Sequence, residues 1–140
     1  MAKSEAAGNG EEQPFGELQL RTLTMPADTN PAGDIFGGWL VSQMDMAGGI
    51  LARSVTEGRA VTVSIDSMTF HQPVKVGDVI ACFGGVERIG RTSIALRLQA
   101  WVLRQGQKPR VKVTEGVFTF VAVDDNGRPR NIRKPGGVEV

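Results

Sequence analysis

The sequence predicts an α+β domain in which a curved antiparallel sheet of five strands wraps around one long central helix. The segment 39–58 is long enough for several helical turns, and its apolar residues fall almost all around the helix. This pattern is typical of a helix that is buried on every side. Other segments alternate apolar and polar residues with a period of two, as strands do. Because one strand precedes the helix and four follow it, we expect the sheet to curl around the helix.

Composition and charge restrict the classes of function. The chain has 140 residues, which suits one domain, and 41% of them are hydrophobic. Its single cysteine, Cys82, excludes an internal disulfide and leaves no thiol pair for a zinc site. The net charge of +1 favours neither nucleic acid nor an anionic membrane as a partner. The chain shows neither a stretch of roughly 18 apolar residues nor the apolar core of a signal peptide, so we expect a soluble cytoplasmic protein without a metal.

Three regions are expected along the chain. Residues 1–15 are largely polar and rich in Ala, Gly, Glu and Asn without periodicity, and we expect them to form a disordered tail. Residues 16–130 are expected to form a single domain without internal repeats. Residues 131–140 contain Pro135 and two glycines, and we expect a flexible C-terminal tail there.

The first strand is expected at Leu18–Met25. The segment 26–38 that follows it is dense in Pro, Gly, Asp and Asn, which are loop residues. It leads into the helix 39–58, which we expect to end at Gly58 because glycine commonly terminates helices.

Four strands with short connections are expected after the helix. In the first of them, 61–70, the alternation changes phase between Ile65 and Met68, which indicates a bulge or a change of face. The other three strands are expected at residues 79–89, 94–102 and 111–123. Short links favour an antiparallel sheet rich in meander connections, and we expect these links at residues 73–78, 90–93 and 105–109.

Asp45 is the unusual residue of the helix, because it lies among apolar neighbours. It either lines a cleft, where perturbed acids often serve catalysis, or it faces solvent or caps a neighbouring backbone. Gly48 and Gly49 each cost roughly 1 kcal/mol relative to alanine inside a helix. They therefore indicate close approach of a ligand, of another backbone or of a second helix. Gly49 lies one turn from Asp45 on the same face.

Gly37 and Gly38 lie at the expected start of the helix. Free backbone N–H groups and the positive end of the helix dipole suit a developing oxyanion there, although loop flexibility alone would also explain two glycines. Asn30 offers a side-chain amide that orients water or a carbonyl, or it is simply a turn residue before Pro31. Asp34 is a candidate N-cap without a chemical role.

Several segments resemble a known family. The stretch LRTLTMPADTNPAGDIFGGWLVSQMDMAGGILA resembles the opening of the bacterial YciA-type acyl-CoA thioesterases, and so do MTFHQPVKVGDVI, GRTSIAL and EGVFTFVAVDDNGRPR. The resemblance covers residues 18–130 and extends, with lower specificity, to the mammalian cytosolic acyl-CoA hydrolases. It implies a hotdog fold, in which a curved sheet wraps one helix. It also implies an enzyme that hydrolyses acyl-CoA to coenzyme A and a carboxylate.

The resemblance implies roles for residues already singled out. The catalytic carboxylate falls on Asp45, the oxyanion donor on a backbone N–H of Gly37 or Gly38, and the paired loop amide on Asn30. Because the Asn and the Asp of one site come from different subunits in such hydrolases, the implied active unit is a dimer, and the implied assembly is a hexamer. Acyl-CoA is the implied partner, and no cofactor is implied beyond the coenzyme A that forms part of the substrate.

Coenzyme A carries phosphates, so the rim of the site is expected to offer cationic and hydroxyl donors. The turn of Gly90, Arg91, Thr92 and Ser93 supplies a guanidinium suited to bidentate phosphate contact and two hydroxyls. The resemblance places nucleotide contacts near this turn. An ordinary hairpin with a solvated arginine is the alternative.

Other candidates for coenzyme A contact are weaker. Arg88, Arg59 and Lys112 supply further cations. The strand that ends at Phe70 is expected to lie along the pantetheine arm and the dimer edge. His71, the only histidine, is given no catalytic role.

The implied hydrolysis leaves alternatives open. Asp45 acts either as a general base toward water or as a nucleophile that forms a mixed anhydride. A hotdog dehydratase uses a histidine near the helix, and the loop 26–38 contains none. A non-catalytic acyl-CoA-binding module of the same fold would lack the helix acid or the loop amide. A purely structural protein would need neither of them.

Overall fold

The computed structural model describes residues 12–103, 110–134 and 138–139, so the expected turn at 105–109 lies outside the described residues. The chain runs through one long helix and strands before and after it: β2 (Glu17–Leu23), the short 3-10 helix η1 (Pro26–Asp28), α1 (Gly37–Thr56), β3 (Ala60–Phe70), β4 (Val79–Ile89), β5 (Ser93–Leu103), β6 (Val111–Ala122), β7 (Arg133–Lys134) and β8 (Val138–Glu139). The last two pair with each other in a separate ribbon.

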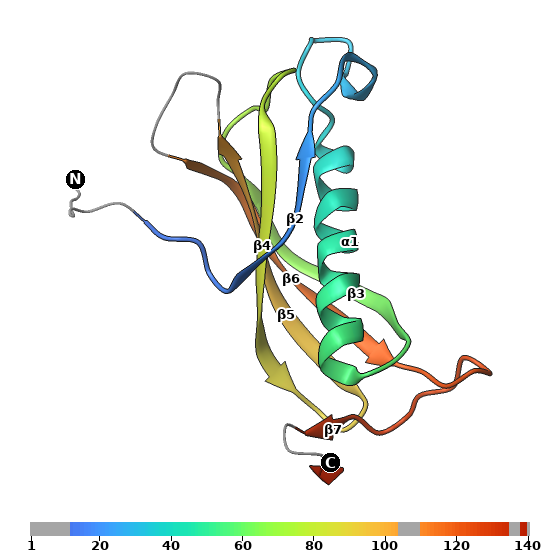
Figure 1. Cartoon of the computed structure of the whole chain (residues 1–140). Helices are drawn as coiled ribbons and strands as arrows, with labels where there is room; N and C mark the ends of the chain where they lie inside the picture. The colour runs from blue at the N-terminus through green and yellow to red at the C-terminus, as the bar shows by residue number, and fades with distance from the viewer. Residues whose placement is uncertain (1–11, 104–109, 135–137, 140) are drawn as a thin grey trace.

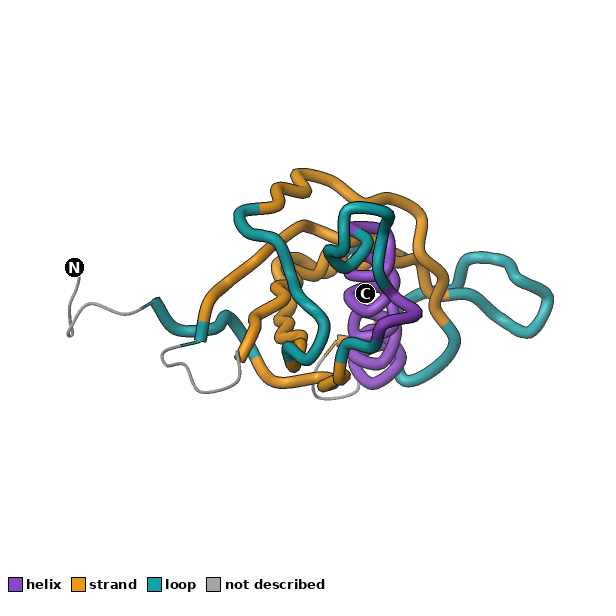
Figure 2. Tube along the Cα trace, turned by 90° about the horizontal axis from the view of Figure 1, so that it is seen from above, coloured by secondary structure: helices purple, strands orange, loops and turns teal. Residues whose placement is uncertain are grey.

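The described residues form a five-stranded antiparallel sheet in the order β2-β4-β5-β6-β3. α1 lies along one face of this sheet (Figure 1), and the view from above shows strands curving around the helix (Figure 2). The predicted α+β arrangement is therefore confirmed. Only β4, β5 and β6 form a meander, because β3 pairs with β6 at one edge while β4 lies next to β2 at the other. Residues 71–78 thus cross between the two edges and do not form a hairpin.

The core lies between α1 and the inner face of the sheet. The helix contributes Leu40, Met44, Ala47 and Ala52, each at most 3% exposed. The facing strands contribute Ile80, Cys82, Ile94, Leu96, Leu98, Ala100, Val102, Val113, Phe118, Phe120 and Ala122.

The outward side of α1 departs from the expected burial on every side. Met46 and Ile50 are each 51% exposed. The sheet of a single chain covers one side of the helix, so the remaining apolar surface of α1 stays open.

The ends of α1 differ slightly from the prediction. The helix begins at Gly37, two residues early, and ends at Thr56, where Glu57 takes the left-handed conformation with φ 57°. Gly58 has a different reason to be glycine, because a Cβ there would lie 2.6 Å from Nη2 of Arg130. The predicted bulge in β3 is confirmed: the register shifts between Asp66 and Thr69, and again between Thr62 and Ser64.

The packed part of the chain extends slightly beyond residues 16–130. The backbone N–H of Phe15 donates to Oε1 of Gln99 at 2.9 Å, and the Phe15 ring lies 4.6 Å from the guanidinium carbon of Arg97. At the other end, Ile132 is fully buried in the core. Both departures have the same cause, an apolar side chain just outside the expected boundary. Residues 1–11, most of the expected N-terminal tail, lie outside the described part of the chain.

Candidate active site

The loop before α1 is held by the side chain of Asn30. Its Oδ1 accepts hydrogen bonds from the backbone N–H groups of Ala32 at 2.9 Å and Asp34 at 3.1 Å. Asn30 is therefore a turn residue, as one interpretation expected. Its side-chain amino group makes no hydrogen bond within the described residues, so it remains free to donate to a ligand.

The N-terminus of α1 has no side-chain cap. Phe36 occupies the N-cap position, and its carbonyl accepts from the N–H groups of Trp39 and Leu40 at 3.1 and 3.3 Å. Asp34 is not the cap, because its carboxylate pairs with the ammonium of Lys75. The N–H groups of the first helical residues, Gly37 and Gly38, thus stay unpaired within the described chain. They lie at the positive end of the helix dipole, where negative charge is stabilised.

A cavity of about 340 Å³ lies at this end of the helix. Asn30 and Gly37 both line it, so two of the predicted site residues come together. Phe70, predicted to lie along the pantetheine arm, lines it from the end of β3. The Phe70 ring would be 3.6 Å from a Cβ at Gly37, an ordinary contact distance, so packing within the chain does not require glycine there. His71 also lines the cavity. The sequence did not indicate this position, because His71 was placed at the end of a strand and the link 73–78 after it was expected to be a simple turn.

Asp45 lies outside this cavity. It is half-buried on α1, and its Oδ1 accepts a hydrogen bond from Oγ1 of Thr62 in β3 at 2.7 Å. Asp45 lies eight positions after Gly37, which is about 12 Å along a helix. Within one chain the acid and the free N–H groups are therefore too far apart to act on one carbonyl. Thr62 was not singled out from the sequence, since the contact joins positions 17 residues apart.

The two glycines beside Asp45 have different surroundings. A Cβ at Gly48 would lie 2.8 Å from Leu98 and 2.9 Å from Phe120, so close packing of α1 on the sheet requires glycine there. The approaching element is a sheet and not a second helix. A Cβ at Gly49 would meet no described atom within 4 Å. Gly49 therefore leaves open space on the helix face that carries Asp45.

The predicted rim lies at the opposite end of α1 from the cavity (Figure 1). The turn of Gly90, Arg91, Thr92 and Ser93 joins β4 to β5, and the N–H of Gly90 donates to the carbonyl of Ser93 at 2.7 Å. The side chains of Arg91 and the weaker candidates Arg59 and Arg88 are exposed. A helix of 20 residues is about 30 Å long, so one chain does not bring this rim to its own cavity.

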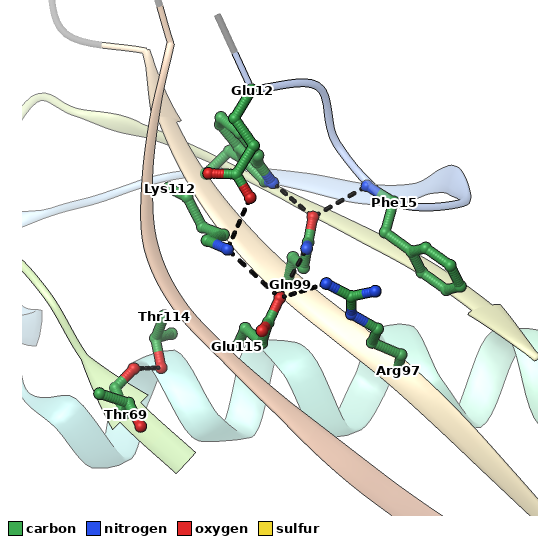
Figure 3. A network of polar contacts seen from close by, with 9 residues as sticks. Glu12, Phe15, Thr69, Arg97, Gln99, Lys112, Thr114 and Glu115 are labelled. Atoms are coloured by element: carbon green, nitrogen blue, oxygen red, sulfur yellow. Dashed lines mark hydrogen bonds and ion pairs between the residues drawn. The ribbon is translucent and has the colours of Figure 1, made fainter. Parts of the chain in front are cut away.

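Lys112 is not available as a phosphate contact. It belongs to a polar network on the sheet face away from α1, where its ammonium contacts Glu12 at 2.7 Å and Glu115 at 3.4 Å (Figure 3). Burial lowers the pKa of Lys112, but the hydrogen bond that its ammonium donates to Glu12 and the charges of both carboxylates outweigh that effect. The pKa therefore lies above its ordinary value. Lys112 remains charged and paired.

Other reactive groups are scarce in the described part of the chain. Burial raises the pKa of the Cys82 thiol to about 12, which makes it a poor nucleophile. No three His, Cys, Asp or Glu side chains of the described residues gather as a metal ion would require. Within the same residues, no helix combines the length and the apolar character needed to cross a membrane.

Comparison with known proteins identifies the family. The family described as the thioesterase superfamily matches residues 32–108. The acyl-CoA thioester hydrolase YciA of Salmonella typhimurium is 52% identical over 126 residues, covering 88% of this chain and 95% of that protein. A solved hexameric broad-specificity acyl-coenzyme A thioesterase is 50% identical with a TM-score of 0.83, covering 91% of this chain and 88% of its own. A hexameric thioesterase of Yersinia pestis is 53% identical with a TM-score of 0.82, covering 86% and 98%. The chain therefore belongs to the thioesterase superfamily, has the hotdog fold, and groups with the YciA acyl-CoA thioester hydrolases.

Proposed function

We propose that this chain hydrolyses acyl-coenzyme A thioesters to coenzyme A and a free carboxylate. The observation that carries the proposal is the cavity at the start of α1, where the side-chain amide of Asn30 and the unpaired N–H of Gly37 lie together. Such donors stabilise the negative charge that develops on a carbonyl oxygen under attack. The activity named for relatives about half identical to this chain supports the same reaction.

The acid of each site comes from a second copy of the chain in this proposal. Asp45 lies about 12 Å along the helix from its own Gly37, so another source is needed. β3 is an edge strand with one unpaired side, and Val61, Val63 and Ile65 on it are between 39% and 55% exposed. Edge strands with exposed apolar residues readily pair with another chain. A second copy along β3 would also cover the open side of α1.

The contacts along β3 indicate where a two-fold axis would lie. Asp45 contacts Thr62, and Gly37 lies against Phe70. In an antiparallel pair of β3 strands, an axis near Asp66 sets Thr62 of one chain opposite Phe70 of the other. The corresponding midpoint on α1 is Val41. Both midpoints bring Asp45 of one chain to the level of Gly37 and Asn30 of its partner, so that each dimer has two complete sites.

The reaction then follows from the groups present. The thioester carbonyl accepts from an N–H of Gly37 or Gly38, and the amide of Asn30 orients the carbonyl or the water. Asp45 removes a proton from water, whose oxygen attacks the carbonyl carbon; the C–S bond breaks, and the thiolate leaves and takes up a proton. Alternatively, Asp45 attacks directly, and water hydrolyses the resulting anhydride. Thr62 holds one carboxylate oxygen of Asp45 and leaves the other free for either route.

The nucleotide of coenzyme A binds at the rim formed by the turn 90–93 together with Arg59 and Arg88. With the axis near Val41, the end of one α1 at Thr56 lies 11 residues, about 16 Å, beyond the level of its partner's Gly37, so Asp45 of one chain serves the cavity of its partner and the rim lies further out along the same direction. Phe70 lines that cavity beside the pantetheine arm. Neither a metal nor a cofactor is needed. The hexameric state of the solved relatives supports the same assembly here, and a reducing cytoplasmic setting belongs to the proposal.

Asp45→Asn tests the chemistry. The change keeps the shape of the side chain and its ability to accept from Thr62, but it removes the basic oxygen. We expect the release of thiol from acetyl-, hexanoyl- and palmitoyl-CoA to fall by about 10²-fold or more. Thr62→Val is the matched control, because it removes only the hydrogen bond, and we expect a smaller loss. A folded Asp45→Asn protein with near-normal turnover would contradict the assignment.

Dehydration of 3-hydroxyacyl-CoA is the second candidate, because His71 lines the same cavity. A dehydratase would lose its activity on His71→Ala, whereas the proposed hydrolysis would largely survive that change. The same fall in thiol release in Asp45→Asn, with unaltered acyl-CoA binding, is the result expected for a hydrolase. Binding without any turnover in the unmodified protein would instead identify a non-catalytic acyl-CoA module.

A further inference from the structure

The segment that follows β6 returns to the end of α1 and to the turn 90–93. From its contacts we infer that Arg130 and Ile132 are positioning residues, which fix the backbones of Arg59 and Arg91 so that both guanidinium groups face the phosphates of the coenzyme A nucleotide. This inference rests on the proposed function, which places the nucleotide at that rim. Arg130 is the last residue of the domain expected from the sequence, and Ile132 lies two positions beyond it.

The guanidinium of Arg130 donates hydrogen bonds to backbone carbonyls at and near the C-terminal end of α1. Its Nε donates to the carbonyl of Val123 at 2.9 Å, its Nη1 to the carbonyl of Thr56 at 3.1 Å, and its Nη2 to the carbonyl of Arg59 at 3.1 Å. A cation at a helix C-terminus is favoured by the dipole. Gly58 is required for this approach, since a Cβ there would collide with the guanidinium. Arg130 is thus committed to holding Arg59 and is not itself a phosphate ligand.

Ile132 anchors the turn that carries Arg91. Its side chain is fully buried in the core, and its N–H donates to the carbonyl of Arg91 at 2.8 Å. The N–H of Ala122 donates to the carbonyl of Thr92 at 2.8 Å, and the N–H of Arg130 donates to the carbonyl of Ala122 at 2.9 Å. The turn is therefore tied both to β6 and to the returning segment.

The same contacts connect the two arginines. Val123 follows Ala122, and its N–H donates to the carbonyl of Arg59 at 3.0 Å. The backbones of Arg59 and of Thr92, the neighbour of Arg91, are thus tied to adjacent residues at the end of β6. Both side chains are exposed and make no hydrogen bond or ion pair within the described residues. Two exposed cations suit a ligand with several negative charges, provided that their backbones are held in place.

The test compares acyl-CoA with the same acyl group on pantetheine, which lacks the nucleotide. Ile132→Ala removes the anchor, and Arg130→Lys keeps the charge but loses the fork that reaches three carbonyls. We expect each change to raise KM for acyl-CoA about fivefold to tenfold, the loss of roughly one charge-assisted contact. We expect kcat for acyl-CoA and both constants for acyl-pantetheine to stay within twofold. Ile132→Val, which retains a buried branched side chain, is the matched control and should behave as the unmodified protein.

Arg91→Ala and Arg59→Ala test the nucleotide rim separately from the positioning role of Arg130 and Ile132. If neither raises KM for acyl-CoA relative to acyl-pantetheine, the proposed nucleotide rim is wrong. If they do raise it but Arg130→Lys and Ile132→Ala do not, the rim stands and the positioning role is overturned. Equal losses for both substrates would show a general structural role and would also overturn it. Should Ile132→Ala fail to fold, Arg130→Lys alone decides between these outcomes.

Discussion

At the residue scale, the adjacent glycines Gly48 and Gly49 have different environments: Gly48 is packed against the sheet, and Gly49 faces open space. A Cβ at Gly48 would press on Leu98 and Phe120, whereas one at Gly49 would meet nothing within 4 Å in the single chain. Both substitutions by alanine gain up to about 1 kcal/mol of helix propensity. For Gly48→Ala, overpacking costs about 1–3 kcal/mol, so we expect a lower melting temperature. For Gly49→Ala we expect an equal or higher one.

Substitutions at Gly48 and Gly49 are expected to affect enzyme activity in the opposite order to thermal stability. Gly49 lies one turn from Asp45 on its face, so a large side chain there would fill the space beside the acid. We expect Gly49→Leu to fold and yet to lower kcat/KM for acyl-CoA at least tenfold, while folded Gly48→Ala retains most of its activity. Thermal unfolding and thiol release measure the two effects. Full activity in Gly49→Leu would show that neither substrate nor partner occupies this face.

The residues of the cavity could be found from the sequence only in part. Asn30 and Gly37 stood out because they belong to one short, loop-forming segment at a helix start. Thr62 and His71 did not, because their roles depend on contacts between distant elements. The half-burial of Asp45 was also beyond reach, since an apolar helix pattern does not say which side the sheet covers. The sequence indicated the rim residues, the acid Asp45 and the donors Asn30 and Gly37, but only Asn30 and Gly37 meet within one chain.

At the scale of elements, β5 and β6 are joined on the outer face by the network around Glu115. Its Oε1 accepts from Gln99 at 2.6 Å, from Arg97 at 3.2 Å and from Lys112 at 3.4 Å (Figure 3). Burial raises the pKa of Glu115, but the hydrogen bond from Gln99 and the charges of Lys112 and Arg97 outweigh it, so the pKa lies below its ordinary value of 4.5. The charged form therefore stabilises the folded state. That contribution is complete above the unfolded pKa and is lost as the pH falls through the folded one.

Glu115→Gln tests this contribution. At pH 7 we expect the free energy of unfolding to fall by about 1 kcal/mol, because a partly exposed carboxylate with several donors is lost. The difference from the unmodified protein should shrink below pH 4.5, where the native carboxylate itself becomes protonated. Urea unfolding between pH 3 and 7 measures both, and Glu87→Gln on exposed β4 surface is the control. A difference that stays constant with pH would contradict the electrostatic account.

The elements themselves were predicted well where the signal was local. The span of β4 and the bulge of β3 follow from alternation and its change of phase. The place of β3 in the sheet does not, because alternation is silent about which neighbour a strand takes. The all-round apolar pattern of α1 was interpreted as burial by its own sheet, yet Met46 and Ile50 remain open. The pattern therefore describes the assembled protein better than the isolated chain.

At the scale of the whole molecule, every step of the proposed reaction depends on a second copy meeting β3 in one register. Cysteine crosslinking measures that register directly, because a disulfide needs Cα atoms within about 4.4–6.8 Å. In antiparallel pairing only residues near the axis face their own equivalents. We therefore expect Asp66→Cys to form a disulfide-linked dimer under mild oxidation, with less product for Ser64→Cys and little for Thr69→Cys. We expect Cys82 not to form a crosslink, because its thiol is buried and has a pKa of about 12.

Glu87→Cys, on exposed surface of β4, is the matched control and should remain monomeric on a non-reducing gel. The crosslinked Asp66→Cys dimer should keep its thiol-release activity, since the axis does not carry a reacting group. A maximum at another β3 position would move the axis, and Asp45 would then no longer reach the level of its partner's Gly37. Because strand side chains alternate, a shift of one residue already turns a different face toward the helix. The position of that maximum therefore decides whether Asp45 and the free N–H groups of α1 can form one site.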